Sequence, residues 1–137
     1  MTTAEIALIA GSAISAMGAI QQGQAASDAA NFNAAIANNN AIASRQAAAE
    51  QVRREKRLGQ KRMGALRAQD PDKLDLLEDS AMEEELALLS ITHAGELEAR
   101  GFSGAASLAR ARGSAARSAS FISASSQLLT TGAEVFG

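Results

Sequence analysis

Hydrophobic residues recur at helical spacing along much of the chain, and they divide it into four predicted helical stretches. The first runs from about Thr3 to Gln22, where isoleucines follow a three- to four-residue period. Thr3 is the expected N-cap, because its hydroxyl can accept a hydrogen bond from a free amide of the first turn. Small residues at four-residue intervals would let helix backbones approach closely, in lipid or in a tight bundle. The candidate membrane or close-packing contacts are Ile6, Ile9, Gly11, Ile14, Gly18 and Ile20.

The second stretch, from about Ala25 to Ala68, is polar at first and basic later. Large apolar residues are few, and three consecutive asparagines at Asn38–Asn40 predict a break or a kink. Gly59 and Gly64 weaken this helix by up to about 1 kcal/mol each.

The only proline marks the sharpest predicted boundary. Asp70 followed by Pro71 is typical of an N-cap and a first helical residue. The third helix is predicted from Pro71 to about Arg100, and it has the clearest amphipathic pattern in the chain. Its packing stripe consists of Leu74, Leu77, Ala81, Leu88 and Ile91.

The fourth stretch follows a junction that Gly101 and Gly104 are expected to loosen, and it runs from about Ser103 to Thr131. It begins with arginines and becomes a Ser/Ala-rich tail. The predicted segments are therefore residues 1–24, 25–69, 70–100 and 101–137. The fold class is all-α, with elongated long helices, a helical hairpin and homo-oligomeric packing as the source of stability.

The composition supports the prediction that the fold is stabilised by homo-oligomeric packing. The chain of 137 residues contains 33 Ala and four Phe, with no Trp and no Tyr. Burial of a large side chain stabilises a fold by about 1.5–3 kcal/mol, and alanine contributes far less. A well-packed monomeric core is therefore hard to build, and we expect the helices to gain stability from neighbouring chains.

The charged residues are sorted into blocks. Residues 45–67 carry eight basic residues against two acids, and residues 70–98 carry ten acids against one lysine. No ionisable side chain lies between Glu5 and Asp28, or between Arg117 and Glu134. A turn near Pro71 would place the basic helix antiparallel to the acidic one, and the same complementarity could act between neighbouring subunits in a ring.

The basic block has two interpretations. Its side chains pair with the acidic helix, or they neutralise nucleic-acid phosphates without reading sequence, since no aromatic residue is present for base stacking. We favour pairing. The candidate contacts are Arg53, Arg54, Lys56, Arg57, Lys61 and Arg62.

Catalytic chemistry has little support. His93 is the sole histidine, the consecutive acids Glu83–Glu85 point in different directions on a helix, and no Gly-x-Ser-x-Gly or phosphate-binding glycine motif occurs. We expect no enzyme activity, no catalytic residue, no metal site and no cofactor.

The uncharged run from Ile6 to Ile20 also has two interpretations. As a helix it spans about 22 Å, which is short of the roughly 30 Å hydrocarbon core of a bilayer. Burial in a bundle and interfacial or oligomeric membrane insertion are both consistent with this length.

The stretch Arg53–Leu129 resembles the small internal virion proteins of short-tailed phages. The resemblance rests on Gly64–Ala68, Leu74–Ala81, Glu84–Ile91 and Gly95–Leu97, followed by an Arg/Ala-rich run at Ala109–Gly113 and a Ser/Ala-rich tail ending in Leu128 and Leu129. Related chains usually carry a Gly/Ser-rich loop where this chain has the shorter Ala68–Pro71 connection.

The resemblance implies a homo-oligomer of the virion interior, above the portal, in contact with the portal and other internal core proteins. It also implies ejection with the genome into the host envelope, where the protein contributes to a conduit for DNA and contacts the host outer membrane. The alternative is a non-specific DNA-binding or packaging accessory inside the capsid, in contact with genomic DNA. A third class, a cytosolic coiled-coil adaptor, predicts sustained apolar heptads, which are not found.

Overall fold

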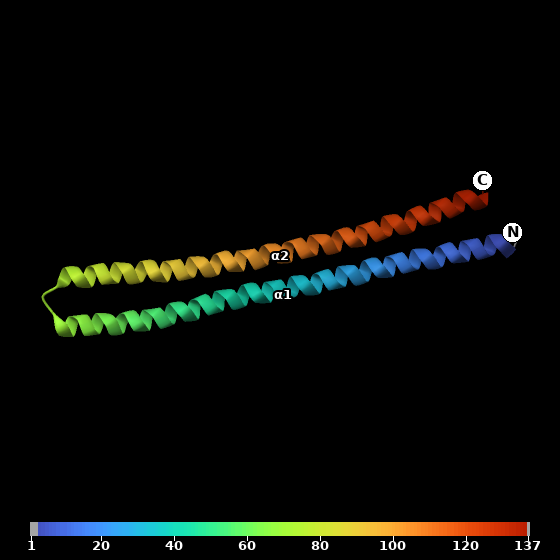
Figure 1. Ribbon diagram of the computed structural model, residues 1–137. Helices are drawn as coiled ribbons and strands as arrows, with labels where there is room; N and C mark the ends of the chain where they lie inside the picture. Colours follow the sequence, from blue (N-terminus) through green and yellow to red (C-terminus); the bar gives the residue numbers. More distant parts are fainter. Residues whose placement is uncertain (1–2, 137) are drawn as a thin grey trace. The chain divides into compact units, whose positions relative to one another are not determined.

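The protein consists of two long helices. A computed structural model describes the backbone of residues 3–136, and within that range the side chains other than those of residues 3–9, 12, 132 and 134–136. Helix α1 spans Thr3–Gln69 and helix α2 spans Leu74–Phe136 (Figure 1). No strand occurs in the described part of the chain. The all-α prediction is confirmed.

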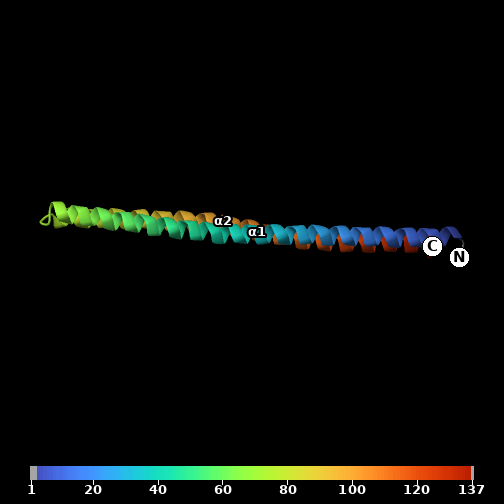
Figure 2. The ribbon, with the colours of Figure 1, turned by 90° about the horizontal axis from the view of Figure 1, so that it is seen from below.

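The chain divides into two compact units, which we describe separately. The terminal unit pairs Met1–Ile36 with Ala105–Gly137, and the turn unit comprises Ala37–Gly104. Both units contain a piece of α1 and a piece of α2. Within each unit the two pieces lie side by side and run antiparallel, as both views of the ribbon show (Figures 1 and 2).

The turn unit is a helical hairpin closed by residues 70–73. The amide of Asp70 still donates to the Leu66 carbonyl at 3.1 Å, and the amide of Lys73 donates to the Asp70 carbonyl at 3.4 Å. The Lys73 ammonium lies 3.1 Å from the Asp70 carboxylate. The predicted turn is thus confirmed, but the prediction that Pro71 begins the third helix is wrong. Pro71 lies in the turn, and α2 begins at Leu74.

The other predicted interruptions are wrong as well. Helix α1 continues through Asn38–Asn40, and α2 continues through Gly101 and Gly104. The reason is tertiary: the buried seam positions on either side of the asparagines, Ala34 and Ala41, pack against α2 within their own units. Packing of one face stabilises a helix more than the propensity of a few exposed residues destabilises it.

The buried seam of the terminal unit is made almost entirely of small residues. Along α1 the seam positions alternate by four and three residues, so that equivalent positions recur every seven residues, and α2 follows the same period from Ala106 to Ser120. Small side chains fill this repeat, and sustained apolar heptads are not formed along these described residues. The seam residues are Ala16, Ile20, Gly23, Ser27, Ala30 and Ala34 on α1, and Ala106, Ala109, Gly113, Ala116, Ser120 and Ala124 on α2.

The seam of the turn unit has a different period and larger side chains. Its positions advance by four, four and three residues, so that equivalents recur every eleven residues. Several members are only half-buried. The seam residues are Ser44, Ala48, Val52, Glu55, Gly59, Met63 and Leu66 on α1, and Leu77, Ser80, Glu84, Leu88, Ile91, Gly95 and Ala99 on α2.

Glycines in the seam let the two backbones come close together. A Cβ added at Gly113 would lie 2.8 Å from the Ala30 Cβ, and one added at Gly95 would collide with the Ala48 Cβ. Real Cβ atoms essentially never approach so closely, so the helices would have to separate. A Cβ at Gly23 would likewise collide with Ser120. The distance between the helices is therefore set by glycine and alanine.

This construction leaves the chain without a conventional core. Among the described residues no large side chain is fully buried, and the buried apolar residues are all alanines. The buried polar residue is Ser27. Large apolar side chains therefore lie mostly at the edges of the seam or on the outer surface.

Candidate interaction surfaces

The six predicted basic contacts lie on α1 in the turn unit, where Arg53 and Arg62 line grooves between the two helices. Every one of them is exposed, and within the described residues none forms an ion pair with the acidic helix. Arg57 lies two residues from both seam positions 55 and 59, which places it about 200° around the helix from the seam. The basic and acidic blocks are antiparallel as predicted, but the predicted pairing of these six side chains with the acidic helix of the same chain is not made.

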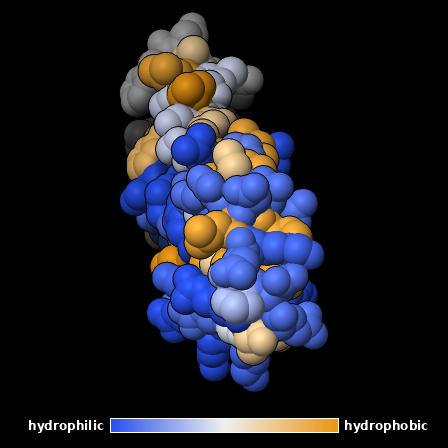
Figure 3. Space-filling view, turned by 90° about the vertical axis from the view of Figure 1, so that its left-hand side faces the viewer, coloured by the Kyte–Doolittle hydropathy of each residue, from blue (hydrophilic) through white to orange (hydrophobic). Residues whose placement is uncertain are grey.

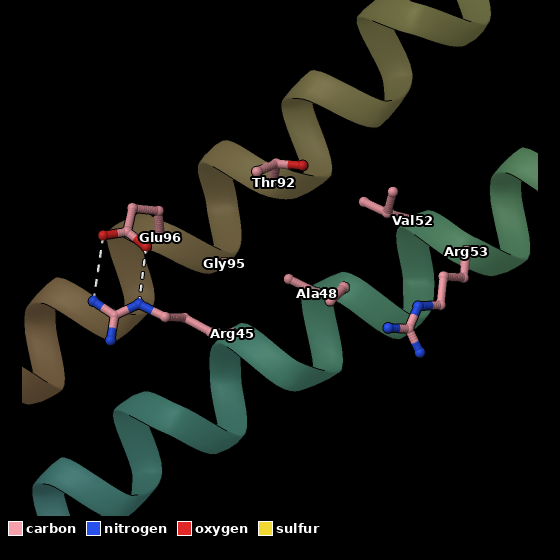
Figure 4. A pocket seen from close by; sticks show the side chains of 8 residues that line it. Arg45, Ala48, Val52, Arg53, Thr92, Gly95 and Glu96 are labelled. Atoms are coloured by element: carbon pink, nitrogen blue, oxygen red, sulfur yellow. Dashed lines mark hydrogen bonds and ion pairs between the residues drawn. The ribbon is translucent and has the colours of Figure 1, made fainter.

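An ion pair between the two helices is formed by Arg45, which is not one of the six predicted basic contacts. Its Nε donates to Glu96 Oε2 at 3.0 Å and its Nη2 donates to Glu96 Oε1 at 3.3 Å (Figure 4). The hydrogen bond from Arg45 lowers the pKa of the Glu96 carboxyl below its ordinary value, and it raises the pKa of Arg45. Arg100, 3.5 Å from Glu96 on the same helix, also lowers the pKa of Glu96.

A shallow groove of about 430 Å³ runs beside this ion pair. Figure 4 shows Ala48 and Val52 of α1 on one side and Thr92 of α2 on the other, with the backbone of Gly95 between them. The Arg45 guanidinium reaches across to Glu96, whereas that of Arg53 reaches no carboxylate. The exposed surface of the lining is mainly apolar, and its charged side chains Arg45 and Glu96 bind each other.

The predicted packing stripe of the acidic helix is divided between two environments. Leu77, Leu88 and Ile91 are half-buried seam positions, and Ala81 is half-buried next to the seam. Leu74 is 73% exposed, because it is the first residue of α2 and precedes the seam.

A second apolar stripe of α2, which the pattern had indicated as a widening of the packing stripe, lies on the outer surface. Met82, Leu86 and Leu89 are 64%, 65% and 59% exposed, and Leu97 continues the stripe. Exposed acids flank it at Glu78, Asp79, Glu83 and Glu85. The end of the turn unit seen in Figure 3 shows the same mixture, with hydrophobic side chains set among hydrophilic ones.

The predicted N-terminal contacts lie largely outside the seam. Ile14 is 72% exposed, and nothing lies within 4 Å of a Cβ added at Gly11 or Gly18. Close packing of these two glycines within the chain is therefore not observed. Ile20 is half-buried in the seam, and the side chains of Ile6 and Ile9 lie outside the described residues.

Nothing in the described part of the chain forms a helix long and apolar enough to cross a membrane. Exposed apolar residues are nevertheless frequent in both uncharged ends, where Phe121, Ile122, Leu128 and Leu129 lie on the surface of α2.

The histidine and the serine hydroxyls do not gather into one site. His93 is exposed, and no cluster of potential metal ligands occurs among the described residues. Most serine hydroxyls of the C-terminal tail donate to backbone carbonyls three or four residues earlier on their own helix, which satisfies them locally. These serines are Ser114, Ser118, Ser120, Ser125 and Ser126.

No protein-family model matches this sequence, and no curated protein or solved structure matches it significantly. The surfaces described above must therefore be interpreted from their own chemistry.

The small residues of the seam were not predicted as packing positions. Their signal was present as Ala, Gly and Ser recurring every seven residues, for example at Gly23, Ala30, Ala37 and Ser44. A search limited to large apolar residues does not detect this period.

Proposed function

We propose that this chain is a structural subunit of the internal core of a short-tailed phage virion, and that it acts as a homo-oligomer. In this proposal the protein resides in the virion interior above the portal, is ejected with the genome, and contributes to a conduit for DNA in the host envelope. Besides the resemblance of residues 53–129, the proposal is supported by one main observation. In the terminal unit the helices pair almost entirely through alanine, glycine and serine, and in both units many large apolar side chains are exposed and available for other molecules.

The exposed area supports an assembling subunit. The chain exposes 9857 Å², whereas a folded monomer of 14.0 kDa typically exposes about 6700 Å². Exposed large apolar side chains such as Met82, Leu86 and Leu129 contribute to this area, and exposed apolar patches are a feature of proteins that bury them against partners. In the proposed mechanism the turn units pack with copies and with other core proteins, and the uncharged ends contact the envelope after ejection.

Location and envelope contact are tested separately. Mass spectrometry of intact particles, with a symmetry-relaxed cryo-EM map around the portal, should find the chain inside the virion; its absence from the particles would refute the proposal. For the envelope step, purified protein should float with liposomes and release an enclosed dye.

Charged substitutions provide the matched control for the envelope step. Ile122→Asp with Leu129→Asp places charges in the uncharged tail and should abolish flotation, because a charge at the interface opposes insertion of the apolar face. Ile42→Asp in the turn unit, at a residue that is 52% exposed, should leave flotation unchanged. Equal binding by both variants would remove the envelope step.

The second candidate function is non-specific DNA binding within the capsid. It is favoured by the six exposed cations of α1, which form no ion pair in the part of the chain that the structure describes. Arg53, Arg57 and Lys61 lie four residues apart on one face and could follow a phosphate backbone.

A salt titration decides this candidate. The triple substitution of Arg53, Arg57 and Lys61 by Gln should reduce the slope of log affinity against log salt by roughly 3. The control triple substitution of the exposed Arg110, Arg112 and Arg117 by Gln should not change the slope. An equal reduction in both variants would indicate general charge attraction rather than a binding face.

A further inference from the structure

Helix α2 of the turn unit has apolar residues on two opposite faces. One face forms the seam with α1. Leu86 lies two residues from both seam positions 84 and 88, and Met82 lies two residues from both 80 and 84, so each is about 200° around the helix from the seam. A helix that is apolar on both sides is typical of an element buried between two neighbours, and the chain supplies only one of them.

The charge around this outer stripe restricts the partner. Glu78, Asp79, Glu83 and Glu85 are exposed beside Met82, Leu86 and Leu89. Acids at this density repel phosphate groups, which disfavours both nucleic acid and anionic lipid as the occupant. The complementary surface is an apolar residue surrounded by cations.

The same chain carries such a surface on the other helix. Leu58 of α1 is 45% exposed. Its neighbours at three and four residues are Arg54, Lys61 and Arg62, all exposed and none in an ion pair with α2. Within the chain Arg62 lines a groove with Glu83 but forms no ion pair with it, and Arg54 and Lys61 lie away from the seam.

We propose that the basic face of α1, formed by Arg54, Leu58, Lys61 and Arg62, packs on the outer stripe of α2, formed by Met82, Leu86 and Leu89, in a neighbouring copy of the chain. Each copy then donates one face and accepts at the other. Such a head-to-tail contact continues from subunit to subunit and closes into a ring where the rotation permits. The proposal rests on the homo-oligomeric part of the proposed function and names its interface.

Two surface variants test the contact. The stripe variant is Met82→Lys with Leu86→Lys, and the basic-face variant is Arg54→Glu with Arg62→Glu. All four positions are exposed, so helical content by circular dichroism should be unchanged. Wild type should assemble in analytical ultracentrifugation, and each variant alone should sediment as a monomer.

Mixing the two variants provides the sharpest outcome. Each retains one intact face, so an equimolar mixture should form a 1:1 heterodimer and nothing larger. The control variant, Ile122→Lys with Leu129→Lys in the terminal unit, should keep the wild-type mass. A monomeric wild type, an assembled basic-face variant, a mixture that stays monomeric or a dissociated control would each overturn the proposal.

This experiment is separate from the test of function. If the variants form the heterodimer but the protein is absent from virions, the interface is supported and the phage role is rejected. If the protein is found inside virions but assembles through other faces, the phage role is supported and the interface is rejected.

Discussion

At the scale of the residue, the effect of a glycine depends on whether its missing Cβ faces the other helix. Gly95 and Gly101 are both interior to α2 and both belong to the turn unit. Gly95 is buried against Ala48, whereas nothing lies within 4 Å of a Cβ added at Gly101. A side chain added at Gly95 therefore collides with the other helix, whereas one added at Gly101 has free space.

Gly95→Leu should lower the free energy of unfolding by about 1–3 kcal/mol, because the added side chain forces the helices apart. Gly101→Leu should raise it by about 0.5–1 kcal/mol, because leucine is the better helix former in open solvent. Urea denaturation followed at 222 nm, at one fixed protein concentration, measures both. Equal effects at the two sites would contradict the close approach at Gly95.

The Arg45–Glu96 pair predicts a pH dependence. Because the pKa of Glu96 is lowered in the folded chain, the pair stabilises the fold above the ordinary pKa of glutamate, about 4.3, and this contribution is lost as pH falls through the lowered pKa. In Arg45→Gln the pKa of Glu96 should rise toward its ordinary value, as followed by the carboxyl carbon signal in an NMR titration.

Arg100→Gln is the matched control for this titration. It removes a guanidinium of the same helix that contributes less to the shift, so the pKa of Glu96 should rise less than in Arg45→Gln. A larger rise in Arg100→Gln would show that the contact between helices is not the main cause.

At the scale of the element, the two units differ in the period of their seams. A seven-residue repeat favours a left-handed supercoil, whereas an eleven-residue repeat favours a slight right-handed one. The terminal unit follows the first period and the turn unit follows the second. Each helix therefore follows a seven-residue period in the terminal unit and an eleven-residue period in the turn unit. On α1 the two periods meet close to Ala37–Ser44.

Cysteine cross-linking tests the pairing of the terminal unit, and the chain contains no cysteine of its own. Ala30→Cys with Gly113→Cys should form a disulfide within one chain on mild oxidation, because their Cβ atoms face each other across the seam. Ala29→Cys with Gly113→Cys should not, since Ala29 is exposed. Non-reducing electrophoresis and mass spectrometry at low protein concentration distinguish bonds within a chain from bonds between chains, and bonds between chains would indicate exchanged helices.

The sequence predicted the helices and the turn better than it predicted their continuity. Alanine, glutamate and leucine favour helix everywhere, and Pro71 interrupts the pattern unambiguously. The breaks expected at Asn38–Asn40 and at Gly101 did not occur, because packing against the other helix overrides local propensity. That packing depends on residues far apart in the chain, which a local pattern does not contain.

The interaction surfaces were predicted less completely, for a similar reason. Charge counts identified the basic and acidic blocks, but the direction of each side chain depends on which face becomes the seam. Arg57 and Leu86 could be assigned to outer faces only once Glu55, Gly59, Glu84 and Leu88 were known to face the opposite helix.

At the scale of the whole molecule, stability should depend on protein concentration. A chain that buries only small residues on its own gains most from contact with copies, and anything that binds the folded state raises its melting temperature. The melting temperature of wild type should therefore rise with protein concentration, as measured by calorimetry. A single cooperative transition that does not vary over a hundredfold range of concentration would contradict homo-oligomeric stabilisation.

The uniform smallness of the seam residues has one more consequence. In the terminal unit, sliding one helix by seven residues would again bring small side chains opposite small side chains, with Ala30 taking the place of Gly23 across from Ser120. The added Cβ would collide with Ser120, so the glycines oppose this shift, whereas the alanine and serine positions discriminate only weakly between alternative alignments. The short connection at residues 70–73 limits how far one helix can slide along the other, and lengthening it would let neighbouring alignments compete.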